Sequence, residues 1–111
     1  MIKTYNKLVR DRIPEIIQRN GQNCRTRILT DEEYIAALDA KLLEECAEYK
    51  DSRSIEELAD IFEVLCAMAA YHGFSKEELI TAQEKKHAER GGFENRIFLI
   101  DVREPYQAET E

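Results

Sequence analysis

Hydrophobic residues recur every three to four positions along three long stretches of this chain, which is the spacing of amphipathic α-helices. The pattern predicts helices at about Asp31–Lys50, Ile55–His72 and Lys76–Arg90. A serine or threonine precedes each stretch, and a glutamate lies three positions after that residue. This capping-box pattern satisfies free amide groups at the start of a helix. Three long helices therefore dominate the predicted fold.

Three shorter elements complete the prediction. A helix is expected from about Asp11 to Asn20, with Asp11 as its N-cap and Gly21 as its stop. Alternating side chains at Cys24–Thr30 and an apolar run at Ile97–Val102 predict two strands that pair with each other. The expected fold class is mainly α, a helical bundle with a small two-stranded β addition.

One face of the first long helix carries apolar residues at heptad spacing and is the expected core face. Its members are Ile35, Leu38, Leu42, Cys46 and Tyr49. At about 100° per residue, Glu45 lies roughly 60° from this stripe and Glu48 roughly 120° from it. Glu44 lies nearly opposite the stripe. We therefore expect Glu45 and Glu48 to lean inward. Glu44 is expected to lie at the surface or to contact the ligands without binding the metal itself.

The second long helix carries two stripes, each suited to burial. The expected core stripe consists of Leu58, Ile61, Phe62, Leu65 and Ala69. The other begins acidic and becomes apolar, with Glu57, Asp60, Val64, Ala67, Met68 and Tyr71. A helix with two buried faces usually belongs to an oligomer, so we expect at least a homodimer. Its contact is expected at or near Val64, Ala67, Met68 or Tyr71.

Two acidic clusters flank the connection between these helices. Glu44, Glu45 and Glu48 precede it, and Glu57 and Asp60 follow it. A connection as short as residues 51–54 makes the two helices antiparallel neighbours. With a rise of ~1.5 Å per residue, the carboxylates other than Glu44 then fall in a layer roughly 5 Å thick. Carboxylates so close repel one another unless a cation lies among them, and oxygen ligands favour Mg²⁺ or Mn²⁺.

A purely structural role is the alternative for each acidic cluster taken alone. Charged residues on a helix usually face solvent, and Glu57 could serve only as the capping partner of Ser54. The matched distance of both clusters from one turn favours the metal site over this alternative.

Cationic residues on the last helix suggest that a phosphate-containing ligand binds beside such a metal. Lys86 and Arg90 project along nearly one line, and Arg90 leads into Gly91-Gly92-Phe93. Lys and Arg near a carboxylate-bound metal commonly surround a phosphate chain. The N-terminal run that contains Lys7 and Arg10 could add to this surface. The alternative is that these are surface charges, since cations favour helix C-termini in any case.

Composition narrows the protein class. With 111 residues, one domain is expected at 1–104, followed by a flexible tail at 105–111. A net charge of −7 argues against a nucleic-acid partner, which usually requires a basic face. The 3 cysteines lack a paired spacing and predict free thiols in a reducing cytosol. No stretch has the length and apolarity of a membrane span or signal core, so we expect a cytoplasmic protein.

Three separated motifs resemble one protein family. They are Tyr5-Asn6-Lys7-Leu8-Val9-Arg10-Asp11-Arg12-Ile13-Pro14, the pair Glu44-Glu45-x-x-Glu48 and Glu57-x-x-Asp60, and Lys86-x-x-x-Arg90-Gly91-Gly92-Phe93. Together they resemble the MazG-like, all-α nucleoside triphosphate pyrophosphatases, in the small branch described as phosphoribosyl-ATP pyrophosphohydrolase-like or house-cleaning proteins. The predicted strands depart from that helical pattern and suggest an addition of this branch.

The resemblance implies an oligomeric, Mg²⁺-dependent enzyme that cleaves between the α and β phosphates of a nucleotide. The products would be a nucleoside monophosphate and pyrophosphate. The implied metal ligands are Glu45, Glu48, Glu57 and Asp60, with Glu45 or Glu48 accepting a proton from the attacking water. The implied phosphate contacts are Lys86 and Arg90, joined by Lys7, Arg10 and Arg96. No residue identifies the nucleotide base.

Two function hypotheses follow from these residues. The first is a nucleotide pyrophosphohydrolase with the roles just given. The second is a non-enzymatic helical module that binds a nucleotide, a metal or a partner protein for regulation. The full set of carboxylates together with cationic partners favours the enzyme.

Overall fold

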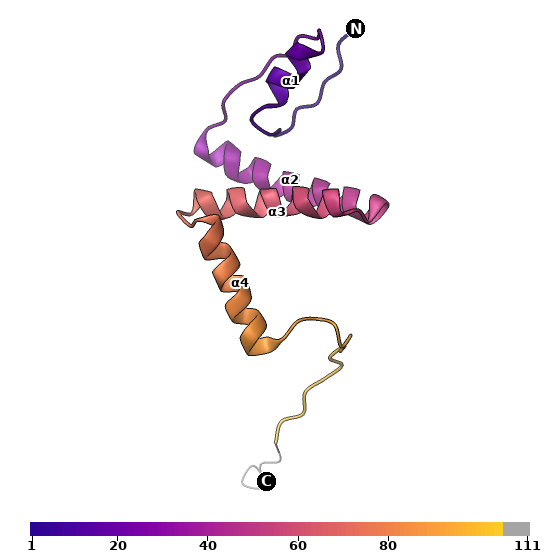
Figure 1. Ribbon diagram of the computed structural model, residues 1–111, viewed down its shortest axis with the longest axis vertical. Coiled ribbons are helices and arrows are strands. Elements are labelled where there is room, and N and C mark those ends of the chain that lie inside the picture. Colours follow the sequence, from indigo (N-terminus) through magenta and orange to yellow (C-terminus); the bar gives the residue numbers. More distant parts are fainter. Residues whose placement is uncertain (106–111) are drawn as a thin grey trace. The chain divides into compact units, whose positions relative to one another are not determined.

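The computed structural model describes residues 1–105, and over these residues the chain forms four helices and no strand (Figure 1). The helices are α1 (Ile13–Arg19), α2 (Asp31–Ser52), α3 (Ile55–Tyr71) and α4 (Lys76–Arg90). The mainly α prediction is confirmed. The chain divides into two units, Met1–Leu79 and Ile80–Glu111, and residues 106–111 of the predicted tail lie outside the described part. None of the described helices is long and apolar enough to cross a bilayer.

Capping residues fix where the long helices begin. At α2 the Thr30 hydroxyl accepts a hydrogen bond from the Glu33 amide at 3.2 Å, and the Glu33 carboxylate accepts one from the Thr30 amide at 3.0 Å. Ser75 and Glu78 form the same reciprocal pair at the start of α4. These two capping boxes confirm the predicted starts of their helices.

At α3 the capping prediction is only half right. The Ser54 hydroxyl accepts a hydrogen bond from the Glu57 amide at 3.2 Å, but the return bond is absent from the described contacts of Glu57. The Glu57 side chain instead lies among other carboxylates near the α2–α3 connection. Glu57 therefore has two roles. Its amide is capped by Ser54 at the start of α3, and its carboxylate belongs to the acidic group near the α2–α3 connection.

A glycine ends α1. Gly21 has a φ of 82°, and its amide and that of Gln22 donate to the carbonyls of Gln18 and Ile17 at 3.0 and 3.2 Å. This Schellman arrangement ends α1 where the sequence predicted.

The predicted start of α1 is wrong by about one residue, because Arg12 rather than Asp11 is the N-cap, and no side-chain hydrogen bond caps this helix. Helix boundaries set only by weak caps shift in this way.

Helices α2 and α3 form a tight hairpin and lie side by side (Figure 1). Only Arg53 and Ser54 separate them, since α2 runs to Ser52, two residues beyond its predicted end at Lys50. Arg53 adopts a left-handed conformation with φ of 55°, and its amide donates to the Tyr49 carbonyl at 2.7 Å. The shorter connection strengthens the antiparallel arrangement that the sequence predicted.

The packing of the hairpin corrects which face of α3 lies inside. Val64 is buried, together with Leu38 from α2, so the stripe containing Glu57, Asp60 and Val64 faces α2. Leu58 and other members of the predicted core stripe are more exposed. Val64, one of the four residues predicted at or near a subunit contact, is thus already buried within the single chain. Periodicity shows that α3 has two apolar faces but not which of them meets α2.

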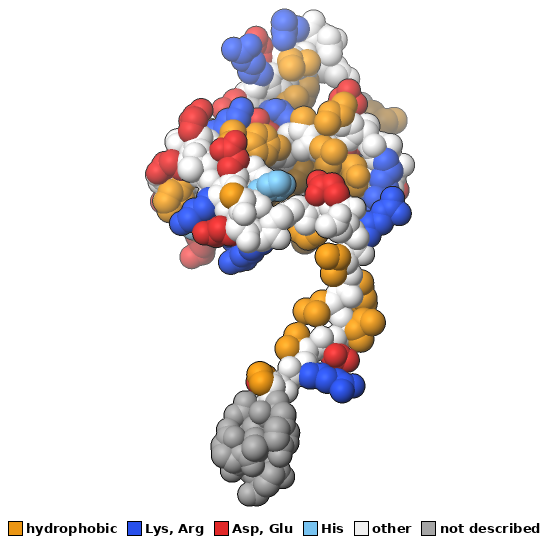
Figure 2. All heavy atoms as spheres, turned by 60° about the horizontal axis from the view of Figure 1, so that its bottom comes forward, with side chains coloured by type: hydrophobic (Ala, Val, Ile, Leu, Met, Phe, Trp, Pro, Cys, Tyr) orange, Lys and Arg blue, Asp and Glu red, His pale blue; other side chains and the backbone are white. Residues whose placement is uncertain are grey.

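The predicted two-stranded addition is absent from the described residues. Neither 24–30 nor 97–102 forms a strand, and Ile28 and Ile97 are 93% and 85% exposed. A strand requires a partner that completes its hydrogen-bond ladder, and side-chain alternation does not supply one. Figure 2 shows hydrophobic side chains exposed along the stretch that precedes the grey residues.

The buried pair predicts a sharp contrast between two leucines of α2. Leu38→Ala should lower the free energy of unfolding by about 2–5 kcal/mol, because it leaves a cavity at the contact with α3. Leu43→Ala, at a residue that is 72% exposed, should change it by no more than about 0.5 kcal/mol. Urea unfolding measures both values. Equal losses would contradict this packing of the hairpin.

Candidate metal centre

Five carboxylates gather where α2 and α3 face each other close to their connection. Oxygen atoms of Glu44, Glu45 and Glu48 lie within 4.8 Å of one another, and so do those of Glu45, Glu57 and Asp60. Glu45 belongs to both groups. The structure thus brings together all four carboxylates predicted from the sequence and adds Glu44. We call these five residues the carboxylate cluster.

The local sequence explains why these side chains meet. Residues three or four positions apart lie on one side of a helix, which joins Glu44 or Glu45 to Glu48, and Glu57 to Asp60. Ser54 starts α3 at a fixed residue and so places Glu57 in its first turn. The short hairpin connection then sets the first turn of α3 beside the last turns of α2.

Glu45 lies at the centre of the cluster and is 5% exposed. Its Oε2 atom lies 3.3 Å from the Lys41 ammonium, whereas Oε1 is buried without a hydrogen-bond partner in the described part of the chain. A buried charged oxygen without a partner is costly, and native proteins rarely contain one without a reason. This oxygen points to a cation as its missing partner.

Glu57 gives a second indication. Its Oε2 atom is also shielded from solvent and lacks a hydrogen-bond partner among the described residues. Burial raises the pKa of this carboxyl, and repulsion from Glu48, Asp60 and Glu45 raises it further. Both effects favour the neutral form, and a bound cation would offset both by stabilising the charged carboxylate.

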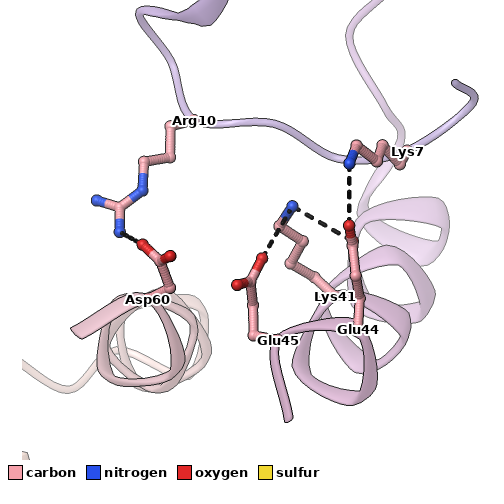
Figure 3. Close-up of polar contacts among 6 residues, drawn as sticks. All are labelled: Lys7, Arg10, Lys41, Glu44, Glu45 and Asp60. Carbon is pink, nitrogen blue, oxygen red and sulfur yellow. Dashed lines mark hydrogen bonds and ion pairs between the residues drawn. The ribbon is translucent and has the colours of Figure 1, made fainter. Parts of the chain in front are cut away.

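Cationic side chains contact the edges of the cluster (Figure 3). The Lys7 ammonium donates to Glu44 Oε2 at 2.9 Å, and Arg10 Nη2 donates to Asp60 Oδ1 at 2.6 Å. The hydrogen bond from Lys7 is the main reason why the pKa of the Glu44 carboxyl lies below its usual value. It likewise raises the pKa of the Lys7 ammonium. Lys7 and Arg10, which the sequence suggested as phosphate contacts, here contact carboxylates.

Lys41 contacts the carboxylate cluster as well, although the sequence analysis missed it. Its ammonium lies 3.3 Å from both Glu44 Oε1 and Glu45 Oε2, and its side chain is largely buried. The signal that could have found it is the spacing of three and four residues from Lys41 to these glutamates, which brings side chains together on one helix. The expected place of Glu44 away from the ligands also changes, because its carboxylate lies in the cluster.

The remaining predicted site residues lie outside this cluster. Lys86 and Arg90 are exposed on α4, and Arg96 follows it with a left-handed φ of 59°. All three belong to the unit that begins at Ile80, whereas the cluster belongs to the unit Met1–Leu79. Their part in the site stays a prediction.

The arrangement is suited to a hard divalent cation. Every donor atom of the five acidic side chains is a carboxylate oxygen, the ligand type that Mg²⁺, Mn²⁺ and Ca²⁺ prefer. Glu45 is buried, while Glu48 is exposed, so the cluster has a closed side and a side open to solvent. A ligand could reach a cation from the side of Glu48.

Comparisons with known proteins give one local relationship. The chain is 59% identical over 44 residues to a protein of Mycolicibacterium smegmatis described as uncharacterized. The match covers 40% of this chain and 45% of that protein, so the chain spans less than half the length of its relative. No family model and no solved structure matches the chain.

The raised pKa of Glu57 predicts how stability depends on pH in the absence of metal. The folded state holds the Glu57 proton more tightly than the unfolded state does, so stability falls as pH rises from the unfolded value through the folded one. Glu57→Gln should therefore raise the melting temperature in EDTA at pH 8 and change it little near pH 4. The exposed neighbour Glu56 offers a matched control, because Glu56→Gln should show no such pH-dependent gain. An equal response of both variants would contradict the raised pKa of the Glu57 carboxyl.

Proposed function

We propose that this protein is a Mg²⁺-dependent nucleotide pyrophosphohydrolase of the MazG-like type, which converts a nucleoside triphosphate or related nucleotide into a monophosphate and pyrophosphate. The observation that carries this proposal is the buried, unpartnered Oε1 atom of Glu45 inside a cluster of five carboxylates. The MazG-like motifs of the sequence support the choice of reaction.

The residues present fit such a metal. Glu45, Glu48, Glu57 and Asp60 would hold Mg²⁺ or Mn²⁺, and Glu44 lies close enough to help. When bound, the metal would neutralise phosphate charge and make a water molecule more acidic. The unpartnered oxygens of Glu45 and Glu57 are the atoms that most need it.

The side chains of the cluster suggest a division of roles. Glu45 is held by burial and by Lys41, so it suits a fixed ligand that keeps the site in shape. Glu48 is exposed and is suited to accept a proton from an incoming water at a carboxylate oxygen. The resemblance, and not the geometry of the cluster, assigns Lys86 and Arg90 to the negative charge on the leaving pyrophosphate.

The proposal predicts pyrophosphate release from a panel of nucleoside triphosphates in Mg²⁺ but not in EDTA. Glu45→Gln should reduce kcat/KM at least about 100-fold, because it removes charge from the centre of the metal site. Glu32→Gln, at an exposed residue in the first turn of α2, should stay within about twofold of the original protein. Release of pyrophosphate measured by a coupled assay gives both values.

A second readout separates the metal site from the reaction. Mg²⁺ at 100 times its Kd should stabilise the native protein by about 2.7 kcal/mol, and Glu45→Gln should remove this effect. Stabilisation without turnover on any nucleotide would favour the non-enzymatic binding module. A melting temperature indifferent to saturating Mg²⁺ would contradict the metal site itself.

We also propose that the active form is a homodimer or a higher homo-oligomer. In the single chain only Leu38 and Val64 are buried apolar residues of the described part. Leu58, Phe62 and Leu65 remain on the outer face of α3, with 36–44% of their surface exposed. A second copy that covers this face would complete a helical bundle.

Light scattering should therefore give at least twice the chain mass of 13.0 kDa at micromolar concentration. Leu65→Glu should shift the protein toward the monomer, because it places a charge on the outer apolar face of α3. Ala70→Glu adds the same charge to α3 at an exposed residue away from that face and should leave the mass unchanged. A 13.0 kDa particle for the original protein would contradict the proposed assembly.

A further inference from the structure

A segment without helical structure crosses the carboxylate cluster near the N-terminus. Lys7 contacts Glu44 on α2, while Arg10 contacts Asp60 on α3 (Figure 3). Three residues of extended chain span at most about 10 Å, close to the usual separation of two packed helices of about 8–10 Å. Residues 7–10 can therefore bridge α2 and α3, and we call them the cationic strap.

The strap rests on the protein by more than its charges. Leu8 and Val9 between the two cations are half-buried, and Asn6 before them has a left-handed φ of 46° that turns the chain. Arg10 also lies 3.6 Å from Glu63 through its second terminal nitrogen. Its guanidinium thus faces two carboxylates of α3, as a planar fork allows.

The positive charges of the strap do not take the place of a metal cation in the cluster. Lys7, Arg10 and Lys41 are three cations against five carboxylates, and Arg10 also faces Glu63, so the protein's own cations do not balance the cluster. The oxygens that lack partners, on Glu45 and Glu57, are not the oxygens that the strap contacts.

The three cations differ in their freedom to move. Lys41 lies on α2 with 17% of its side chain exposed, and it contacts the buried Glu45. The side chains of Lys7 and Arg10 are 40% and 52% exposed and come from a segment outside any helix. Lys7 and Arg10 can therefore turn from a carboxylate to another anion without a change in α2 or α3.

We propose that the cationic strap makes the cluster select a divalent cation together with a polyphosphate over the free cation, an inference that rests on the proposed function. While Lys7 and Arg10 stay on Glu44 and Asp60, their positive charges oppose a bare divalent cation. A polyphosphate on that cation offers oxygens to both side chains. Charge-assisted contacts to phosphate replace those to carboxylate, and the carboxylates become available to the metal.

A simple tether is the plain alternative, since exposed ion pairs usually contribute little beyond holding a segment in place. A tether predicts that removing the two cations loosens the N-terminus without improving any affinity. The strap predicts that two affinities change in opposite directions.

Calorimetric titration of the full chain with two ligands distinguishes these roles. The double variant Lys7→Met/Arg10→Gln should bind Mn²⁺ alone roughly fivefold more tightly, because two opposing charges are gone. The same variant should bind a non-hydrolysable α,β-methylene triphosphate, in saturating Mg²⁺, roughly 10- to 100-fold more weakly. Lys3→Met/Arg19→Gln removes the same charge from the N-terminal region outside the strap and should shift each constant by less than about twofold.

The outcomes separate the strap from the proposed function. Opposite shifts in the strap variant, with neither shift in the control, support the proposal. Normal Mn²⁺ binding by the original protein with unchanged or uniformly weaker binding by the strap variant overturns the strap and leaves the metal site in place. If the original protein binds neither Mn²⁺ alone nor the triphosphate in Mg²⁺, the proposed function fails and the strap fails with it.

Discussion

Mutual repulsion among five carboxylates is the constraint on which the rest of this site depends. The α2–α3 hairpin holds Glu45 between its helices, and the short connection prevents the acidic turns from moving apart. Such crowding destabilises a folded protein unless positive charge compensates for it. Glu45 and Glu57 show that compensation by the protein's own side chains is incomplete, since each keeps one shielded oxygen without a partner.

Positive charge reaches the cluster by three routes that differ in permanence. Lys41 is part of α2 and stays with Glu44 and Glu45. Lys7 and Arg10 approach from a segment outside any helix and contact only the edges. A divalent cation would supply the rest, at oxygens that neither of the other routes satisfies. On the proposals made above, the site would combine a fixed counterion, two exchangeable ones and a place for a metal, which would suit a ligand that carries both a cation and several phosphate oxygens.

The exposed apolar side chains of the chain are a second constraint, because they favour assembly with another copy. The hairpin buries few apolar side chains, and much of the outer face of α3 remains in solvent. Phe93 and the apolar residues at 97–100 are also exposed. Exposed apolar surface of this extent is typical of chains that bury it against another copy. Because α3 carries acidic ligands on one face and apolar residues on another, assembly and the metal site would use the same helix without competing for the same side chains.

Local interactions were predictable from the sequence because they act within four residues. The capping boxes at Thr30 and Ser75, the bounds of α4 and the stop at Gly21 depend only on neighbouring backbone and side-chain groups. The approach of the acidic turns also followed, because a connection of a few residues leaves two helices little choice of arrangement.

Contacts between distant residues were decided only by the tertiary structure. Lys7 meets Glu44 across 37 positions, and Arg10 meets Asp60 across 50, without any periodic signal that links them. The choice of the Val64 face of α3 for packing on α2 depends on how two surfaces fit, and both faces of α3 carry apolar residues in the sequence. The predicted strands failed for the same reason, since side-chain alternation does not provide the second strand that a ladder needs. The sequence by itself determined the helices and the acidic turns, whereas the fold decided which groups oppose them, because charge pairing and packing depend on distances that no local pattern encodes.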